Sequence, residues 1–207
     1  MFNSTLMRLT LGLIAIVALA GLHIAALFAL LHPRVSREYR AYYVDKVSTD
    51  WRVQRYQSSV EEGIDFVKPG WPYFVDYSFG ILGVEPTGRW TDTRLGLRAG
   101  FEFVHSFSGP MCVVVDASPF DSMRSRKVGV AFGDQKKEIS FGPDESPHMF
   151  LIDFDLPSPT NTLALVLPRP LPRASHNNPR QPGVLLKRIR MFSQSCSAVT
   201  PLLAPSR

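Results

Sequence analysis

The densest group of residues that could do chemistry lies between Gly83 and Asp92, in the segment GVEPTGRWTD. It holds carboxylates at Glu85 and Asp92, a guanidinium at Arg89 and an indole at Trp90. A planar guanidinium can hold a carboxylate through two hydrogen bonds and can stack on an indole. An aromatic face with polar neighbours also suits a sugar, because a pyranose has an apolar face and a rim of hydroxyls. Glu85, Arg89, Trp90 and Asp92 are therefore candidate ligand-binding residues.

A structural interpretation of the same cluster is also open. Glu85 and Arg89 can pair across a turn, and Trp90 can close one end of a folded core. Trp90 lies at the entry to a predicted strand, TDTRLGL, and this position favours the structural interpretation.

Other chemistry is poorly supported by the sequence. Asp153 and Asp155 form a D-x-D pair, which binds a divalent metal in nucleotide-sugar transferases, but those enzymes need an α/β nucleotide-binding domain. His105 falls on the same strand face as Phe101, Phe103 and Phe107 and is therefore expected in the core. No G-x-S-x-G, H-E-x-x-H or P-loop motif is present. We therefore expect no catalytic residue, no metal site, no cofactor and no enzymatic activity.

The element that decides where these residues work is an apolar stretch at 9–31, which contains no Asp, Glu, Lys or Arg. At about 1.5 Å per residue, a helix of this length crosses the roughly 30 Å hydrocarbon core of a bilayer. A signal peptide cleaved after Ala18-Leu19-Ala20 is the alternative. However, the apolar run continues beyond that site and exceeds the usual signal length. We expect an uncleaved anchor that spans the lipid bilayer once, preceded by a stub at 1–8 and followed by a juxtamembrane stalk at 32–60.

The charged residues bear on two questions, a nucleic-acid partner and the orientation of the chain in the membrane. The formal net charge is +5, and no nucleic-acid-binding signature accompanies it, so a nucleic-acid partner is not expected. Arg8 precedes the apolar stretch, whereas Arg34, Arg37, Arg40 and Lys46 follow it. This Lys/Arg bias alone places the following domain in the cytoplasm.

The two cysteines, Cys112 and Cys196, have two interpretations. They can close one disulfide in an oxidising compartment. Alternatively, Cys112, within the apolar run MCVVV, is a small buried hydrophobic residue.

Residues 61–195 have the period-two pattern of β-strands. Apolar residues alternate with polar or small ones at 101–107, 128–132 and 150–156, and Gly, Pro, Asp and Ser clusters fill the gaps as predicted turns at 108–110, 133–134, 142–144 and 157–159. Short strands at this spacing, without intervening helices, indicate an antiparallel β-sandwich, jelly-roll-like and all-β. In the last strand, GVLLKRIRMF, Ile189 and Met191 share the face of Val184 and Leu186 only if Lys187-Arg188 forms a bulge. The tail at 196–207 is expected to be loose.

Three segments together resemble a known family. These are Ile64-Asp65-Phe66 with Pro69-Gly70-Trp71-Pro72, the core Gly88-Arg89-Trp90-Thr91, and the terminal strand Gly183-Val184-Leu185-Leu186-Lys187-Arg188-Ile189-Arg190. The chain is similar over about residues 62–192 to the β-sandwich accessory domain at the C-terminal end of some bacterial membrane glycosyltransferases and phosphoglycerol transferases. It departs from that family at Thr87, where the family usually has a tryptophan.

The resemblance implies a non-catalytic, extracytoplasmic domain associated with cell-envelope glycans. On that basis we expect a cytoplasmic-membrane protein with a periplasmic domain, accessory to glycan synthesis or modification. An envelope glycan or a membrane glycosyltransferase is the expected partner. The alternative is a structural subunit of an envelope assembly without a ligand.

Overall fold

The computed structural model describes residues 4–31, 35, 39–46, 54–169 and 181–203. The chain divides into two compact units, residues 1–36 and 37–207. Its helical elements are α1 (Ser4–Leu31), η1 (Arg40–Val44), η2 (Asp121–Met123) and α3 (Cys196–Leu203). Its strands are β1 (Arg55–Tyr56), β2 (Ile64–Asp65), β3 (Trp71–Pro72), β4 (Val75–Phe79), β5 (Arg89–Asp92), β6 (Arg98–Pro119), β7 (Lys127–Phe132), β8 (Gln135–Ser140), β9 (His148–Val166) and β10 (Pro182–Phe192).

The first unit contains the helix α1. Its segment Leu11–Leu31 has 21 residues and a mean hydropathy of 2.6, so it is long and apolar enough to cross a membrane. The one titratable side chain in that segment, His23, bonds within the helix, since its Nδ1 lies 2.9 Å from the carbonyl oxygen of Leu19. The helix α1 includes the residues predicted at 9–31 and begins earlier, at Ser4, so residues 4–8 of the predicted stub are helical.

The second unit is an antiparallel β-sandwich, which confirms the predicted fold class. In its main sheet β2, β10, β6, β9, β7 and β8 follow one another, while β4 also pairs with β6 and β5 with β10. The first layer contains β4, β7, β8 and the parts of β6 and β9 at 98–103 and 162–166. The second layer contains β2, β5, β10 and the parts of β6 and β9 at 109–119 and 148–156.

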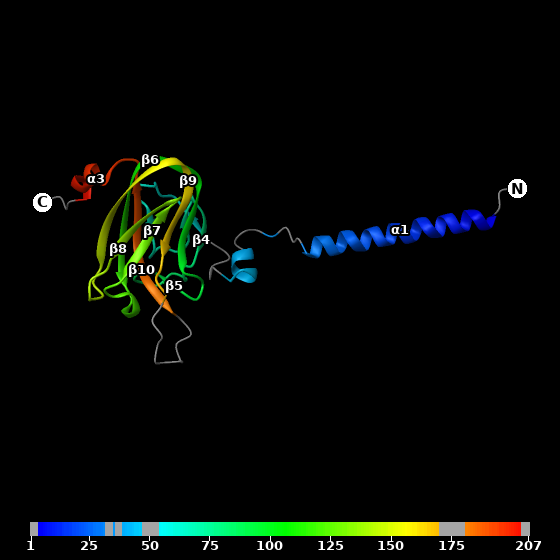
Figure 1. The fold of residues 1–207 in the computed structure, drawn as a ribbon, viewed down its shortest axis with the longest axis horizontal. Helices are drawn as coiled ribbons and strands as arrows, with labels where there is room; N and C mark the ends of the chain where they lie inside the picture. The colour runs from blue at the N-terminus through cyan, green and yellow to red at the C-terminus, as the bar shows by residue number, and fades with distance from the viewer. Residues whose placement is uncertain (1–3, 32–34, 36–38, 47–53, 170–180, 204–207) are drawn as a thin grey trace. The chain divides into compact units, whose positions relative to one another are not determined.

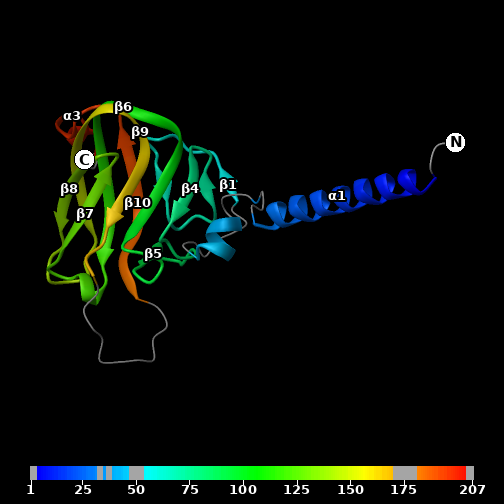
Figure 2. The same cartoon turned by 45° about the vertical axis from the view of Figure 1, so that its right-hand side comes forward.

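Two long strands therefore belong to both layers. Figures 1 and 2 show β6 and β9 arching over one end of the sandwich. The β6–β9 register shifts between Glu102 and Phe107 and again between Phe107 and Gly109, where Gly109 has φ of 77°. The turns predicted at 108–110 and 157–159 are thus wrong as chain reversals. They are bends inside continuous strands, because each strand changes layer there with a shift in register and pairs with the other strand again on both sides of the bend.

The core between the layers follows the predicted alternation. Buried apolar side chains come from both layers: Phe101, Phe103, Val113, Val115, Val128, Val130, Phe132, Ile152, Phe154, Leu156, Leu163, Leu165, Val184, Leu186, Ile189 and Met191. The bulge needed in β10 is confirmed, since its register with β6 shifts between Leu186 and Arg188. That extra residue returns Ile189 and Met191 to the core face.

His105 differs from its prediction. It is exposed, together with Val104 and Ser106, because these residues lie where β6 crosses between the layers and simple alternation no longer holds.

The predicted domain boundaries also need correction at both ends. β1, assigned from sequence to the stalk at 32–60, pairs in parallel with β3. The start of the tail predicted as loose, 196–203, forms the helix α3, in which Cys196 and Val199 are buried. Residues 204–207 lie outside the described part of the chain. A two-residue strand and a short amphipathic helix both depend on tertiary contacts, so neither has a strong local sequence signal.

The two cysteines are joined. Cys112 on β6 and Cys196 at the start of α3 form a disulfide with a Cα–Cα distance of 4.8 Å. Around it Val114, Val199, Leu151 and Phe192 form a small second apolar cluster. The disulfide therefore fastens α3 over the outer face of the second layer.

Candidate functional site

A tight hairpin positions the candidate cluster. Glu85 and Gly88 exchange backbone hydrogen bonds, with N···O distances of 2.9 and 3.2 Å. Gly88 has φ of +142°, and a Cβ placed there would lie 2.2 Å from the carbonyl oxygen of Leu186. Glycine at this position is therefore required for β5 to approach β10.

Arg89 points into the sandwich. It lies opposite Leu186 of β10, and its residue is 1% exposed. Its Nη2 donates hydrogen bonds to the carbonyl oxygens of Lys68 (3.3 Å) and Gly70 (3.2 Å), and its guanidinium carbon lies 4.1 Å from the centre of the Trp71 ring. A buried cation needs such acceptors and an aromatic face to offset its desolvation. Arg89 is thus a structural residue of the core.

Trp71, in turn, helps to hold the segment at 54–56. The backbone N–H of Trp71 donates to the carbonyl of Gln54 (2.9 Å), and that of Tyr73 donates to the carbonyl of Tyr56 (3.1 Å). The side chain of Arg55 donates to the carbonyl oxygens of Val75 and Asp76. Arg89, Trp71 and residues 54–56 form a continuous set of contacts, which we call the β1 clasp. It joins two motifs on which the family resemblance rests.

Trp90 lies on the opposite face of β5, toward the outside of the second layer. It is half-buried, with its ring edge-on to Phe120 at a centroid distance of 5.5 Å. Its Nε1 donates to Oε2 of Glu85 at 3.2 Å. Glu85 is thus joined to Trp90, whereas the sequence analysis considered a pair with Arg89.

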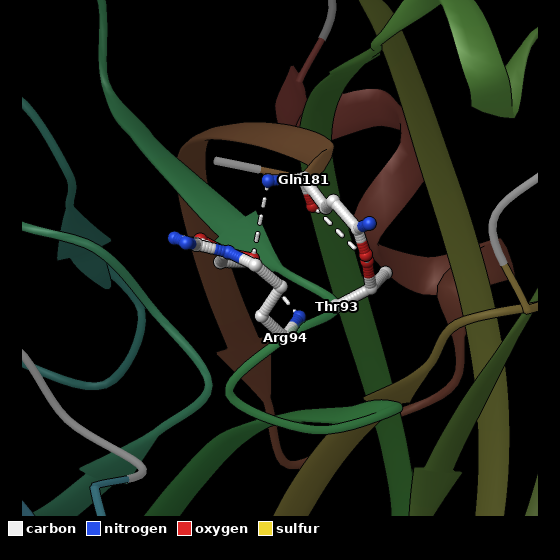
Figure 3. A network of polar contacts seen from close by, with 4 residues as sticks. Thr93, Arg94 and Gln181 are labelled. Carbon is white, nitrogen blue, oxygen red and sulfur yellow. Dashed lines mark hydrogen bonds and ion pairs between the residues drawn. The ribbon is translucent and has the colours of Figure 1, made fainter. Parts of the chain in front are cut away.

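Asp92 ends β5 in a polar network, and Figure 3 shows Thr93, Arg94 and Gln181 of this network. Its buried carboxylate accepts hydrogen bonds from the backbone N–H of Arg94 (2.9 Å), from Nη2 of Arg94 (2.6 Å) and from the backbone N–H of Gln181 (3.4 Å). Burial raises the pKa of the Asp92 carboxyl, but the hydrogen bonds and charge of Arg94 outweigh it and leave the pKa below its ordinary value. The network ties the end of β5 to the residue that precedes β10.

This network predicts acid sensitivity. Because the folded-state pKa of Asp92 is depressed, its ionised form contributes stability that is fully present above its unfolded-state pKa and is lost as pH falls through the folded-state pKa. Asp92→Asn is expected to lower the free energy of unfolding at pH 7 and to flatten its decline below the ordinary pKa of 3.8. Urea unfolding across pH 2–7 measures both. Asp134→Asn, which changes an exposed carboxylate in the β7–β8 turn, is the control. Parallel pH profiles for wild type and Asp92→Asn would contradict the assignment.

The four candidate residues therefore do not converge on one site. Arg89 faces the core, Trp90 and Glu85 face outward, and Asp92 holds the strand end. Only Trp90 and Glu85 present atoms on the outer face, where a ligand could meet them.

A second site, which the sequence analysis did not assemble, is an open groove of about 640 Å³. It is lined by Pro110, Gln135, Lys136, Lys137, Asp153, Phe154, Asp155 and Ser195. The D-x-D pair was visible in the sequence, but its proximity to β8 was not. Asp153 is used structurally, since it accepts the backbone N–H of Cys196 at 2.6 Å. Within the described residues, no group of three or more His, Cys, Asp and Glu residues is placed to hold a metal ion.

The fold and these contacts define the class of protein. It is a β-sandwich domain in which the motifs that contain Trp71 and Arg89 form the β1 clasp, and the long apolar helix α1 precedes this domain in the sequence. The chain belongs to the family described as "Domain of unknown function (DUF7024)", whose sequence model matches residues 49–193. The matched region begins before β1, so the family domain includes β1, as the contacts of the β1 clasp also indicate.

Proteins named phosphoglycerol transferase I share part of this sequence. Those of Escherichia coli (strain SE11) and Shigella boydii serotype 18 are each 26% identical over 129 residues, which cover 60% of this chain. The chain spans 17% of the length of these relatives.

Among solved structures, the domain is similar to family 29 carbohydrate-binding modules. A lysine-to-alanine mutant of the module CBM29-2 gives a TM-score of 0.45 at 14% identity, covering 65% of this chain and 93% of that chain. Another structure, titled "Carbohydrate binding module family29", gives 0.43 at 15% identity, covering 70% and 96%.

Proposed function

We propose that this chain is a membrane-anchored, non-catalytic cell-envelope protein whose carbohydrate-binding-like β-sandwich assists the synthesis or modification of a glycan. The observation that carries the proposal is the similarity to phosphoglycerol transferase I over 129 residues. Because this segment is less than a fifth of that enzyme, an accessory role fits it better than catalysis. The expected partners are the lipid bilayer, an envelope glycan and a membrane glycosyltransferase.

Anchoring is proposed for α1, whose apolar segment is long enough for one crossing of the cytoplasmic membrane. The Lys/Arg bias favours a cytoplasmic domain, but the Cys112–Cys196 disulfide favours an oxidising compartment. We assign the sandwich to the periplasmic side, because a disulfide of this kind is rare in the cytosol. Protease treatment of intact spheroplasts is expected to degrade the sandwich, and its protection until lysis would reverse the orientation.

A structural subunit without a ligand is the second candidate, and it is favoured by one observation. Arg89 and Asp92, two of the four candidate residues, are occupied by contacts within the domain. Retention of the full chain on immobilised neutral polysaccharide supports the glycan role. Its absence, together with stoichiometric copurification of a membrane protein, supports the structural subunit.

A substitution of Trp90 distinguishes a ligand-binding role of the candidate cluster from a structural one. Trp90→Ala is expected to lower the free energy of unfolding by about 1–3 kcal/mol, because the half-buried ring packs on Phe120 and bonds Glu85. Polysaccharide retention by the folded fraction is expected to remain unchanged. Chemical denaturation and polysaccharide retention are measured on the same preparation, with Tyr73→Ala, an exposed aromatic, as control. An unchanged unfolding midpoint with lost retention would instead make Trp90 a ligand-binding residue.

A further inference from the structure

The groove lined by Lys137 and Asp155 lies between two open strand edges. Among the described strands, β8 pairs with β7 alone, and residues 148–156 of β9 pair with β6 alone. The remaining edge of each strand therefore offers backbone donors and acceptors at the open side of the sandwich. The groove volume, about 640 Å³, lies within the range of small-molecule sites, about 300–1,000 Å³.

Gln135 fixes the geometry of this groove. Its Oε1 accepts the backbone N–H of Asp155 at 3.3 Å, and its Nε2 donates to the carbonyl oxygen of the same residue. The amide thus takes the place that a neighbouring strand would occupy at Asp155. It holds the edge of β9 against β8 and leaves the rest of the groove open.

The charged side chains along the groove are available to a ligand. In the described part of the chain, no ion pair or side-chain hydrogen bond engages the charged ends of Lys136, Lys137 or Asp155, whereas Asp153 is held by Cys196. Lys137 lies opposite the buried Val130 in the register, so it lies on the core-facing side of β8, and it lines the groove. A charge that points inward on an edge strand opposes addition of another strand. This arrangement disfavours a peptide as the ligand.

The positive charges of the two lysines that line the groove balance the negative charges of its two aspartates. Together these side chains offer both hydrogen-bond donors and hydrogen-bond acceptors. Adjacent hydroxyls of a sugar each donate and accept, so they match such a surface, while a polyanion gains no net attraction from it. We propose that the groove between β8 and β9 binds a neutral oligosaccharide segment, with Lys137 donating to sugar oxygens and Asp155 accepting from sugar hydroxyls. This inference rests on the proposed glycan role and names its site and ligand class.

Calorimetric titration of the full chain tests the proposal. The protein is kept in a zwitterionic detergent that carries no sugar headgroup, and the probes are linear hexasaccharides of glucose and of mannose. At least one probe is expected to bind wild type. Lys137→Gln and Asp155→Asn are each expected to raise the Kd at least about tenfold, because each removes one charge-assisted hydrogen bond. The controls are Lys127→Gln and Asp121→Asn, which remove charges outside the groove that pair at the surface with Glu138 and Arg124. Thermal unfolding verifies that all four variants are folded.

The outcomes separate this inference from the function on which it rests. Binding that survives both groove variants overturns the site but leaves a glycan role in place. Tighter binding of a sulfated hexasaccharide than of the neutral probes overturns the ligand class. Wild type that binds neither hexasaccharide overturns the inference, and retention on immobilised polysaccharide then decides the glycan role by itself.

Discussion

Arg89→Ala is expected to lower the free energy of unfolding by about 2–4 kcal/mol, a large share of the stability of an ordinary domain. The substitution leaves the carbonyl oxygens of Lys68 and Gly70 without their charged donor and removes the cation from the face of Trp71. The β1 clasp then loses its support from within the core. Urea unfolding of the full chain in detergent, followed by tryptophan fluorescence, measures the loss.

Arg98→Ala is the matched control, because Arg98 is an exposed arginine at the start of β6. Its unfolding midpoint is expected to stay close to that of wild type. Arg89→Lys separates charge from geometry, since an ammonium keeps the charge but lacks the planar group that stacks on Trp71. We expect it to restore only part of the lost stability. An Arg89→Ala protein as stable as Arg98→Ala would show that the clasp does not stabilise the domain.

Reduction of the Cys112–Cys196 disulfide is expected to destabilise the domain by about 2–5 kcal/mol. The bond joins residues 84 positions apart, and closing a long loop removes much conformational freedom from the unfolded chain. It also fastens α3 over the second apolar cluster, so reduction is expected to expose Val114 and Val199. Unfolding with and without a reducing agent measures the difference.

The control for this experiment is the double variant Cys112→Ala with Cys196→Ala. Its unfolding midpoint is expected to match that of the reduced wild type and to be unaffected by the reducing agent. A midpoint of wild type that stays constant after complete reduction, verified by thiol titration, would refute the stabilising role.

The sequence was sufficient to predict the fold class, because the alternation that identifies a strand is a pattern among residues that are close together in the sequence. Alternation of apolar and polar residues in β7, β9 and β10 determines which side chains are buried. In β10 this alternation is out of phase across Lys187-Arg188, which required a bulge, and the structure contains one. The bends in β6 and β9 could not be predicted in the same way. Gly109 and Pro157 are typical of turns, and only the pairing of both strands across two layers makes these positions bends.

The candidate site was harder to predict than the fold. The sequence identified Arg89 and Asp92 as chemically capable residues but gave no information about which face each occupies. Arg89 is buried against Trp71, which lies in a motif earlier in the chain, and the groove combines Gln135 and Lys137 with Asp155 from a different strand. Such long-range proximity depends on strand order, which spacing along one sequence does not encode.

The disulfide also determines what proteolysis can release. Cys112 and Cys196 close a covalent ring that contains β7, β8, β9 and β10. A single cut inside this ring leaves both fragments bonded to each other and still connected to α1, so they separate only on a reducing gel. Release of the sandwich from its helix therefore requires a cut outside the ring, on the N-terminal side of Cys112. A single cut inside the ring leaves the sandwich attached to the helix.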